Sequence, residues 1–200
     1  MPRRVHFSMI RGFHLADLFT IANGFCGVAA LFAAMTFLTT GDRRWLWGAA
    51  LLVPVALVFD VLDGRVARWR HTASALGREL DSLADVISFG VAPAGIAFAA
   101  GLNSVLDQLV LMYFVGCGLS RLARFNITAD SMAGDAGKVS YFEGTPIPTS
   151  VVPLALLMVA FQADALMPVS VLGAELHLAS LLFFVSGSLM ISKTLRIPKL

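Results

Sequence analysis

The chain alternates between long apolar segments and short polar connections, and this pattern predicts its elements. Six segments have about 20 mostly apolar residues, the length that an α-helix needs to cross the hydrocarbon core of a membrane. They occupy residues 18–40, 45–69, 80–100, 104–124, 148–166 and 173–194. We therefore predict an all-α, polytopic membrane protein with six transmembrane helices in one domain that covers residues 1–200.

The composition agrees with this prediction. Hydrophobic residues make up 58% of the chain and charged residues only 14%, whereas a soluble domain is about 45–50% apolar and about 25% charged. The segment 1–17 mixes three arginines with apolar residues, which favours an interfacial amphipathic helix lying on an anionic leaflet. A flexible terminus is the alternative for this segment.

The distribution of basic residues predicts the orientation. An even number of spans puts both termini on the same side of the membrane, and 13 of the 15 Lys and Arg residues fall on that side. The opposite side holds Arg43 and Arg44. Since Lys and Arg concentrate in cytoplasmic loops, we expect both termini to face the cytoplasm at the cell membrane.

Four aspartates interrupt the apolar pattern between the second and third predicted spans. Asp60 and Asp63 are three residues apart and Asp81 and Asp85 are four apart, so each pair shares one face of a helix. A hairpin through residues 70–77 would bring the four carboxylates to the cytoplasmic ends of both helices. This cluster is the candidate active site.

The residue types indicate metal and phosphate chemistry. Converging carboxylates repel each other unless cations neutralise them, and all-oxygen ligation favours hard ions such as Mg²⁺ or Mn²⁺. Gly64 and Ala67 leave space beside the carboxylates, and Arg68 offers a fork suited to phosphate. We predict two divalent cations and a substrate with a diphosphate, with solvated Asp–Arg pairs in a loop as the alternative.

The full run resembles the signature of the CDP-alcohol phosphatidyltransferase family, and every signature position is met. It reads Asp60-x2-Asp63-Gly64-x2-Ala67-Arg68-x8-Gly77-x3-Asp81-x3-Asp85. The resemblance implies six transmembrane helices, a homodimer, two metals, and transfer of a phosphatidyl group from a CDP-lipid to an alcohol with release of CMP. It also implies residue roles: metal ligation by Asp60, Asp63, Asp81 and Asp85, general base catalysis by Asp85, and a CDP pocket lined by Gly64, Ala67, Arg68 and Gly77.

Two further stretches, residues 118–126 and 141–148, are similar to the phosphatidylserine synthase branch of this family. This similarity implies CDP-diacylglycerol and L-serine as substrates. Arg121 and Arg124, one helical turn apart, suit the carboxylate of serine, and Glu143 suits its ammonium. Glycerol phosphate and inositol phosphate remain alternative acceptors.

The other predicted contacts have simple structural alternatives. Asn126 either binds the acceptor or caps a helix, and Thr20 and Asn23, on one face of the first span, either contact the nucleotide or pack against a helix. Membrane lipids are expected partners, and nucleic acid is not. A divalent-cation transporter is the remote alternative, because transport sites lie near the bilayer midplane and these aspartates lie at helix ends.

Overall fold

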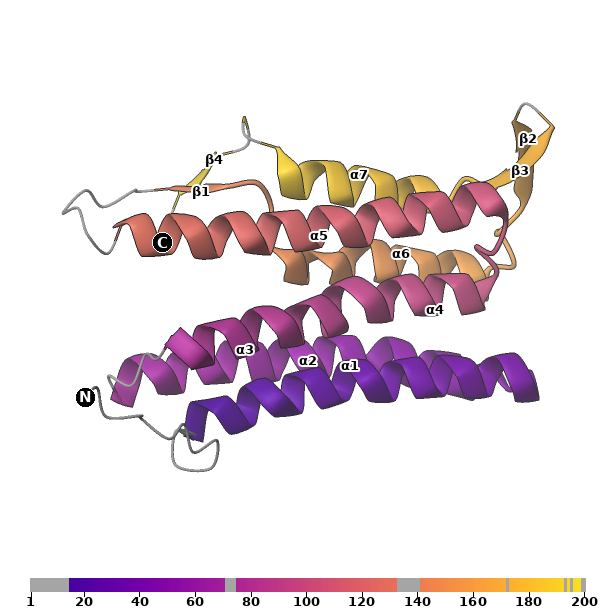
Figure 1. Ribbon diagram of the computed structural model, residues 1–200. Helices are drawn as coiled ribbons and strands as arrows, with labels where there is room; N and C mark the ends of the chain where they lie inside the picture. Colours follow the sequence, from indigo (N-terminus) through magenta and orange to yellow (C-terminus); the bar gives the residue numbers. More distant parts are fainter. Residues whose placement is uncertain are drawn as a thin grey trace, which may run out of the picture.

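The computed structural model describes residues 15–70, 75–132, 141–171, 173–192, 194 and 196–198. The predicted interfacial helix at 1–17 falls almost entirely outside the described residues, since only its last three residues belong to the first helix. Within the described ranges the protein is mainly helical, as the apolar pattern predicts. The helices run alongside one another and successive helices alternate in direction (Figure 1).

Among the residues that the structure describes, four helical segments are long and apolar enough to cross a membrane: Ala16–Thr40, Arg43–Val66, Leu76–Ala100 and Val105–Ile127. They belong to helix α1 (Leu15–Thr40), α2 (Arg43–Arg70), the continuous run α3 (Ala75–Asp85), η1 (Val86–Val91) and α4 (Ala92–Ala100), and α5 (Val105–Met132). Only 22% of the apolar window in α2 is buried inside the protein. Because the rest of that apolar surface faces outward, the surroundings of these helices are lipid.

The last two predicted spans are shorter in the structure than in the sequence prediction. A 3-10 turn, η2 (Ile147–Ser150), leads into α6 (Val151–Gln162), and α7 covers Ser180–Ile191. The predicted start at residue 173 is wrong, because strand β3 (Ala174–His177) pairs there in an antiparallel hairpin with β2 (Pro168–Val171). A 12-residue helix is about 18 Å long, so neither α6 nor α7 alone has the length of a span.

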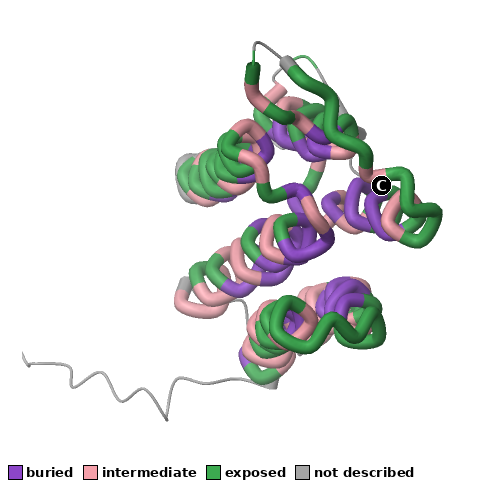
Figure 2. The backbone as a smooth tube through the Cα atoms, turned by 90° about the vertical axis from the view of Figure 1, so that its right-hand side faces the viewer, coloured by how far each residue is buried: buried purple, intermediate pink, exposed green. Residues whose placement is uncertain are grey.

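Small residues bring the first two helices close together. Ala30, Ala33 and Ala34 of α1 and Ala49 and Ala56 of α2 are all buried in one core cluster, and α1 packs more extensively on α2 than on any other element. Alanine at such positions lets helix backbones approach within a membrane. Figure 2 shows the buried faces of the helices turned toward one another.

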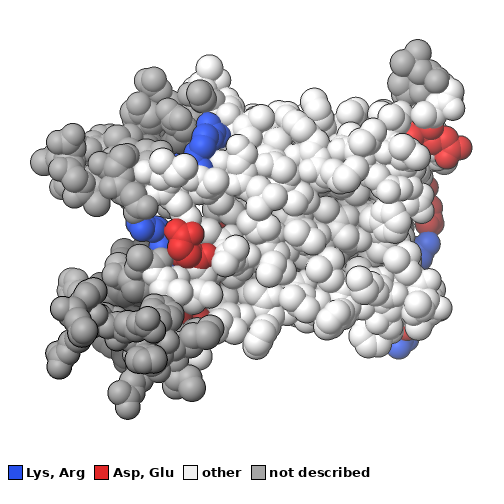
Figure 3. Space-filling model, viewed as in Figure 1, with Lys and Arg blue, Asp and Glu red and all other residues white. Residues whose placement is uncertain are grey.

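Charged residues gather at the two ends of the bundle and leave an uncharged band between them on the face shown in Figure 3. At one end lie the carboxyl ends of α2 and α5, the start of α3, and strands β1 (Tyr141–Glu143) and β4 (Arg196–Pro198), which pair with each other. The turn between α1 and α2 and the β2–β3 hairpin lie at the opposite end (Figure 1). This separation of polar ends from an apolar middle is typical of a multi-pass membrane protein.

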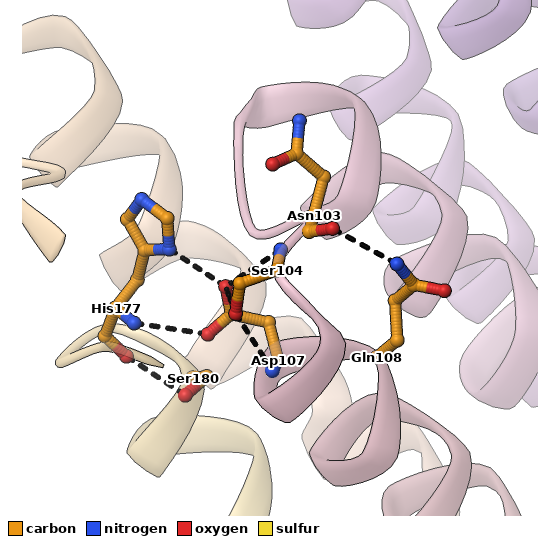
Figure 4. Close-up of polar contacts among 6 residues, drawn as sticks. All are labelled: Asn103, Ser104, Asp107, Gln108, His177 and Ser180. Carbon is orange, nitrogen blue, oxygen red and sulfur yellow. Dashed lines mark hydrogen bonds and ion pairs between the residues drawn. The ribbon is translucent and has the colours of Figure 1, made fainter. Parts of the chain in front are cut away.

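A buried carboxylate at the opposite end ties α5 to the hairpin and α7 (Figure 4). Asp107 is fully buried and accepts hydrogen bonds from His177 Nδ1 at 2.6 Å, from the His177 backbone N–H at 3.0 Å and from Ser104 Oγ at 2.7 Å. Ser180 Oγ in turn donates to the His177 carbonyl at 2.7 Å. His177, which has no partner nearby in the sequence, therefore has one 70 residues away.

Replacing His177 tests the Asp107–His177 contact, which we call the joint between α5 and the hairpin. His177→Ala leaves Asp107 buried without its imidazole donor, and an unsatisfied buried group of this kind costs on the order of 1–3 kcal/mol. We expect the apparent melting temperature of the detergent-solubilised protein to fall by several degrees, measured by scanning fluorimetry. Gln108→Ala, which removes an exposed hydrogen bond to Asn103, is the matched control. Equal melting temperatures for both variants would contradict the role given to the joint.

Candidate active site

Three of the four aspartates come together where α2 ends and α3 begins. Asp60 and Asp63 lie on α2, Asp81 lies on α3, and each offers a carboxylate oxygen within 4.8 Å of the other two. Asp63 is buried and the other two are half-buried. The sequence prediction that carboxylates from the two helices converge is therefore confirmed for these three residues.

Asp85 lies at the edge of this cluster, one turn further along α3. It is buried and near enough to Asp60, Asp81 and Asp63 to interact with each electrostatically. Its Oδ1 accepts a hydrogen bond from Asn23 Nδ2 at 3.1 Å. Its predicted metal ligation stays a prediction.

The donor set fits a hard divalent cation. The cluster consists of carboxylate oxygens, the ligands that Mg²⁺ and Mn²⁺ prefer. Asp81 Oδ1 is buried and has no hydrogen-bond partner among the described residues. A buried acceptor without a partner is costly, and a bound cation would satisfy it while removing the repulsion between the carboxylates.

A positive charge faces the cluster from α5. Arg121 interacts electrostatically with Asp85 and Asp60, and its guanidinium carbon also lies 5.8 Å from the centre of the Phe125 ring. Arg124 follows on the same helix and also interacts with Arg121. The structure thus brings Arg121 to the aspartates, although the two are 36 or more residues apart in the chain.

Helix α1 reaches the cluster through two buried polar side chains. Thr20 Oγ1 donates to Asp63 Oδ2 at 2.7 Å, and Asn23 donates to Asp85. Both residues were expected to contact the nucleotide or to pack against a helix, and the structure shows them bonded to carboxylates. Their contact with a nucleotide stays a prediction.

Asn126 connects α5 to α3. Its Nδ2 donates to Ser82 Oγ at 3.1 Å, and the Glu79 carboxylate lies 3.4 Å away. Asn126 therefore does not cap the end of α5, which continues to Met132. Its place beside α3, the helix that carries Asp81 and Asp85, leaves the predicted acceptor contact open.

The remaining predicted residues are placed by their backbones. Gly64, Ala67 and Arg68 continue α2 beyond Asp63, and Gly77 lies in the first turn of α3. Glu143 ends β1, where it pairs with Arg196 of β4. The side chains of Ala67, Arg68 and Glu143 lie outside the described part of the structure.

A π-helical turn that the sequence pattern did not predict follows Asp85 immediately. Residues Val86–Val91 form η1 inside the third span, and π-helical turns are frequent at functional sites. Pro93 supplies a physical reason, because proline lacks an N–H and its ring clashes with the carbonyl four residues earlier in an α-helix. A proline inside an apolar span is not a sufficient sequence signal, because Pro54 lies inside α2, which stays α-helical from Arg43 to Arg70.

Comparison with known proteins gives the family. A sequence model of the CDP-alcohol phosphatidyltransferase family matches residues 13–186. The CDP-diacylglycerol–serine O-phosphatidyltransferase of Saccharomyces cerevisiae is 43% identical over 203 aligned positions, which cover 97% of this chain and 74% of that protein. The chain belongs to the CDP-alcohol phosphatidyltransferase family.

Two bacterial relatives carry the same name as the yeast protein. The Helicobacter pylori protein is 41% identical over 142 positions, or 70% of this chain and 55% of the relative. The Bacillus subtilis protein is 31% identical over 146 positions, or 72% and 75%. The chain thus spans about three quarters of two of these relatives and just over half of the third. As a member of a transferase family that generally uses divalent metals, it has an aspartate cluster that can bind one.

Neutralising one aspartate tests the metal site. Asp81→Asn removes one of the three mutually close carboxylates, and we expect Mn²⁺ affinity measured by calorimetry to fall by at least about tenfold. Glu79→Gln is the matched control, because Glu79 is an exposed acid two residues away on the same helix. Affinity within twofold of the unchanged protein for Asp81→Asn would contradict the assignment.

Proposed function

We propose that this protein transfers the phosphatidyl group of CDP-diacylglycerol to the hydroxyl of L-serine, which gives phosphatidylserine and CMP. The observation that carries the proposal is the junction of α2, α3 and α5, where carboxylates able to hold a cation face Arg121 at the end of an apolar bundle. The relatives named as serine O-phosphatidyltransferases favour serine as the acceptor.

The position of the cluster suits a lipid that carries a charged head. The helices beside it are apolar along the length that crosses the membrane, so acyl chains can lie against their outer surface. The diphosphate then reaches the polar end, where Arg68 contributes a charged fork and Gly64, Ala67 and Gly77 leave room for the nucleotide. Divalent cations held by Asp60, Asp63, Asp81 and Asp85 would offset the charge of the diphosphate and of the departing CMP.

Asp85 carries the proton transfer in this proposal. Its carboxylate accepts the proton of the serine hydroxyl as the serine oxygen forms a bond to the phosphorus attached to the lipid. The bond between that phosphorus and the bridging oxygen breaks, and CMP leaves with the electron pair. The Asp85 carboxylate suits this role because it is buried and because the hydrogen bond from Asn23 to its Oδ1 fixes its orientation.

The acceptor is bound from the α5 side. Arg121 and Arg124 hold the serine carboxylate, Glu143 pairs with the ammonium, and Asn126 contacts the same ligand at the α3–α5 boundary. The positive charge of Arg121 is also attracted by Asp85 and Asp60, and this attraction favours a position of its side chain that faces the site.

In this proposal the chain crosses the membrane six times, through the four long apolar helices and two further crossings. Helix α6 with η2, and α7 with the β2–β3 hairpin, complete the two final crossings of a single domain, as part of a homodimer. Both termini and the acidic cluster face the cytoplasm at the cell membrane, because basic residues concentrate at that end. The segment 1–17 lies on the same leaflet, where anionic lipids attract its arginines.

An acceptor panel tests the substrate. Purified protein with Mn²⁺ and labelled CDP-diacylglycerol is supplied with L-serine, glycerol phosphate or inositol phosphate, and phosphatidyl product and CMP are measured. We expect product with serine and CMP release that depends on serine. CMP release of equal rate with either phosphorylated alcohol, or without any serine dependence, would contradict serine as the acceptor.

Removing the proposed base tests the mechanism. Asp85→Asn keeps the size of the side chain but cannot accept the proton, so we expect kcat to fall by about 10²–10⁴-fold. Glu175→Gln, an exposed change on β3 at the opposite end, is expected to leave kcat unchanged. An Asp85→Asn enzyme with at least a tenth of the normal kcat would exclude Asp85 as the base.

A further inference from the structure

Helix α1 holds both ends of the acidic cluster from one face. Thr20 and Asn23 are three residues apart on α1, and they bond to aspartates of two different helices. Thr20 donates to Asp63 of α2, and Asn23 donates to Asp85 at the end of α3. All four residues are buried, and Asn23 is completely inaccessible.

A second contact fixes α1 against the turn that follows Asp85. Ser88 Oγ, within η1, donates to the backbone carbonyl of Asn23 at 2.8 Å. The two backbones approach closely there, because a Cβ added to Gly27 would lie 2.8 Å from Ser88 Cα. Asn23 therefore makes two contacts with this region. Its side chain donates to Asp85, and its backbone carbonyl accepts from Ser88 in the π-helical turn that follows Asp85.

This closed arrangement distinguishes α1 from a helix that merely packs nearby. The Asn23 amide, the Asp85 carboxylate and the Ser88 hydroxyl link α1 to α3 and η1, with Ser88 three residues beyond Asp85. The π-helical turn sets where Ser88 lies relative to Asp85, since an α-helix would place the hydroxyl at a different rotation. The π-helical turn thus positions Ser88 to hydrogen-bond with α1.

We propose that Thr20, Asn23 and Ser88 are positioning residues that set the direction of the Asp63 and Asp85 carboxylates. The role of Asp85 as base rests on the proposed function, whereas the hold on Asp63 concerns metal binding alone. Outer residues that orient ligands in this way typically change metal affinity or activity by about 10- to 100-fold when removed.

The variants remove single hydrogen bonds with little change in shape. Thr20→Val replaces a hydroxyl by a methyl group, Asn23→Leu replaces the amide by an apolar group of similar size, and Ser88→Ala deletes one oxygen. Two controls match them. Thr36→Val changes a threonine of α1 that donates to its own helix, and Ser180→Ala deletes a fully buried serine hydroxyl that also donates to a backbone carbonyl.

The first measurement is independent of turnover. The apparent melting temperature of each purified variant is followed as Mn²⁺ is added, and the concentration at half of the full stabilisation is recorded. We expect Thr20→Val and Asn23→Leu to raise this concentration by about tenfold, while Thr36→Val leaves it within twofold. Unchanged half-saturation for both site variants would overturn the proposal.

The second measurement separates positioning from general stability at saturating Mn²⁺. We expect Ser88→Ala to lower kcat by about tenfold with KM for CDP-diacylglycerol and serine within twofold, and Ser180→Ala to keep kcat. Equal losses of kcat in both serine variants would overturn the proposal, and so would an Asn23→Leu enzyme with raised KM for CDP-diacylglycerol at unchanged kcat. If the unaltered protein released no CMP with any alcohol, the proposed function would fail, and the Mn²⁺ titration would still decide the positioning of both carboxylates.

Discussion

Repulsion between carboxylates at the end of an apolar bundle is the constraint on which the rest of the structure depends. Asp60, Asp63 and Asp81 offer oxygens within 4.8 Å of one another, and Asp63 and Asp85 are buried. Burial strengthens this repulsion, because the surroundings of the helices screen charge poorly. The positive charge of Arg121 on α5 and hydrogen bonds from Thr20 and Asn23 on α1 offset part of this repulsion. A buried Asp81 oxygen has no partner among the described residues and could bind a cation. Each of these groups comes from a different part of the chain, so the site forms only when α1, α2, α3 and α5 pack together.

The two ends of the bundle use buried carboxylates in opposite ways. At the far end, Asp107 is satisfied entirely by protein donors, from His177 and Ser104, and serves to hold α7 and the β2–β3 hairpin on α5. At the near end, three carboxylates offer oxygens close to one another, and a buried oxygen of Asp81 has no hydrogen-bond partner among the described residues. A carboxylate whose partners are all protein donors holds helices together, whereas a cluster of neighbouring carboxylates suits the binding of a hard cation. An uncharged band separates the two ends on the face shown in Figure 3.

Local patterns predicted much of this arrangement, and contacts between distant segments were not predictable. The spacing of Asp60, Asp63 and Asp81 on two helix faces predicted their convergence, because helix periodicity and a short hairpin leave little choice. The last predicted span, by contrast, began too early, because its first residues pair as β3 with β2, and a short apolar run does not distinguish a helix from a strand. The bonds from Thr20 and Asn23 to the aspartates depend on how α1 packs, and no spacing within α1 specifies its partner. The π-helical turn after Asp85 was not predicted either, and only the structure shows that Ser88 of this turn donates to the backbone carbonyl of Asn23.

The proposed chemistry requires that the aspartates hold cations, and electron paramagnetic resonance of Mn²⁺ bound to the unaltered protein in lipid nanodiscs tests this directly. We expect two Mn²⁺ ions per chain with spectra broadened by mutual coupling, as for ions about 4 Å apart, and loss of the coupled signal in Asp60→Asn. Spectra of free or isolated Mn²⁺ at concentrations that saturate the protein's thermal stabilisation would contradict it.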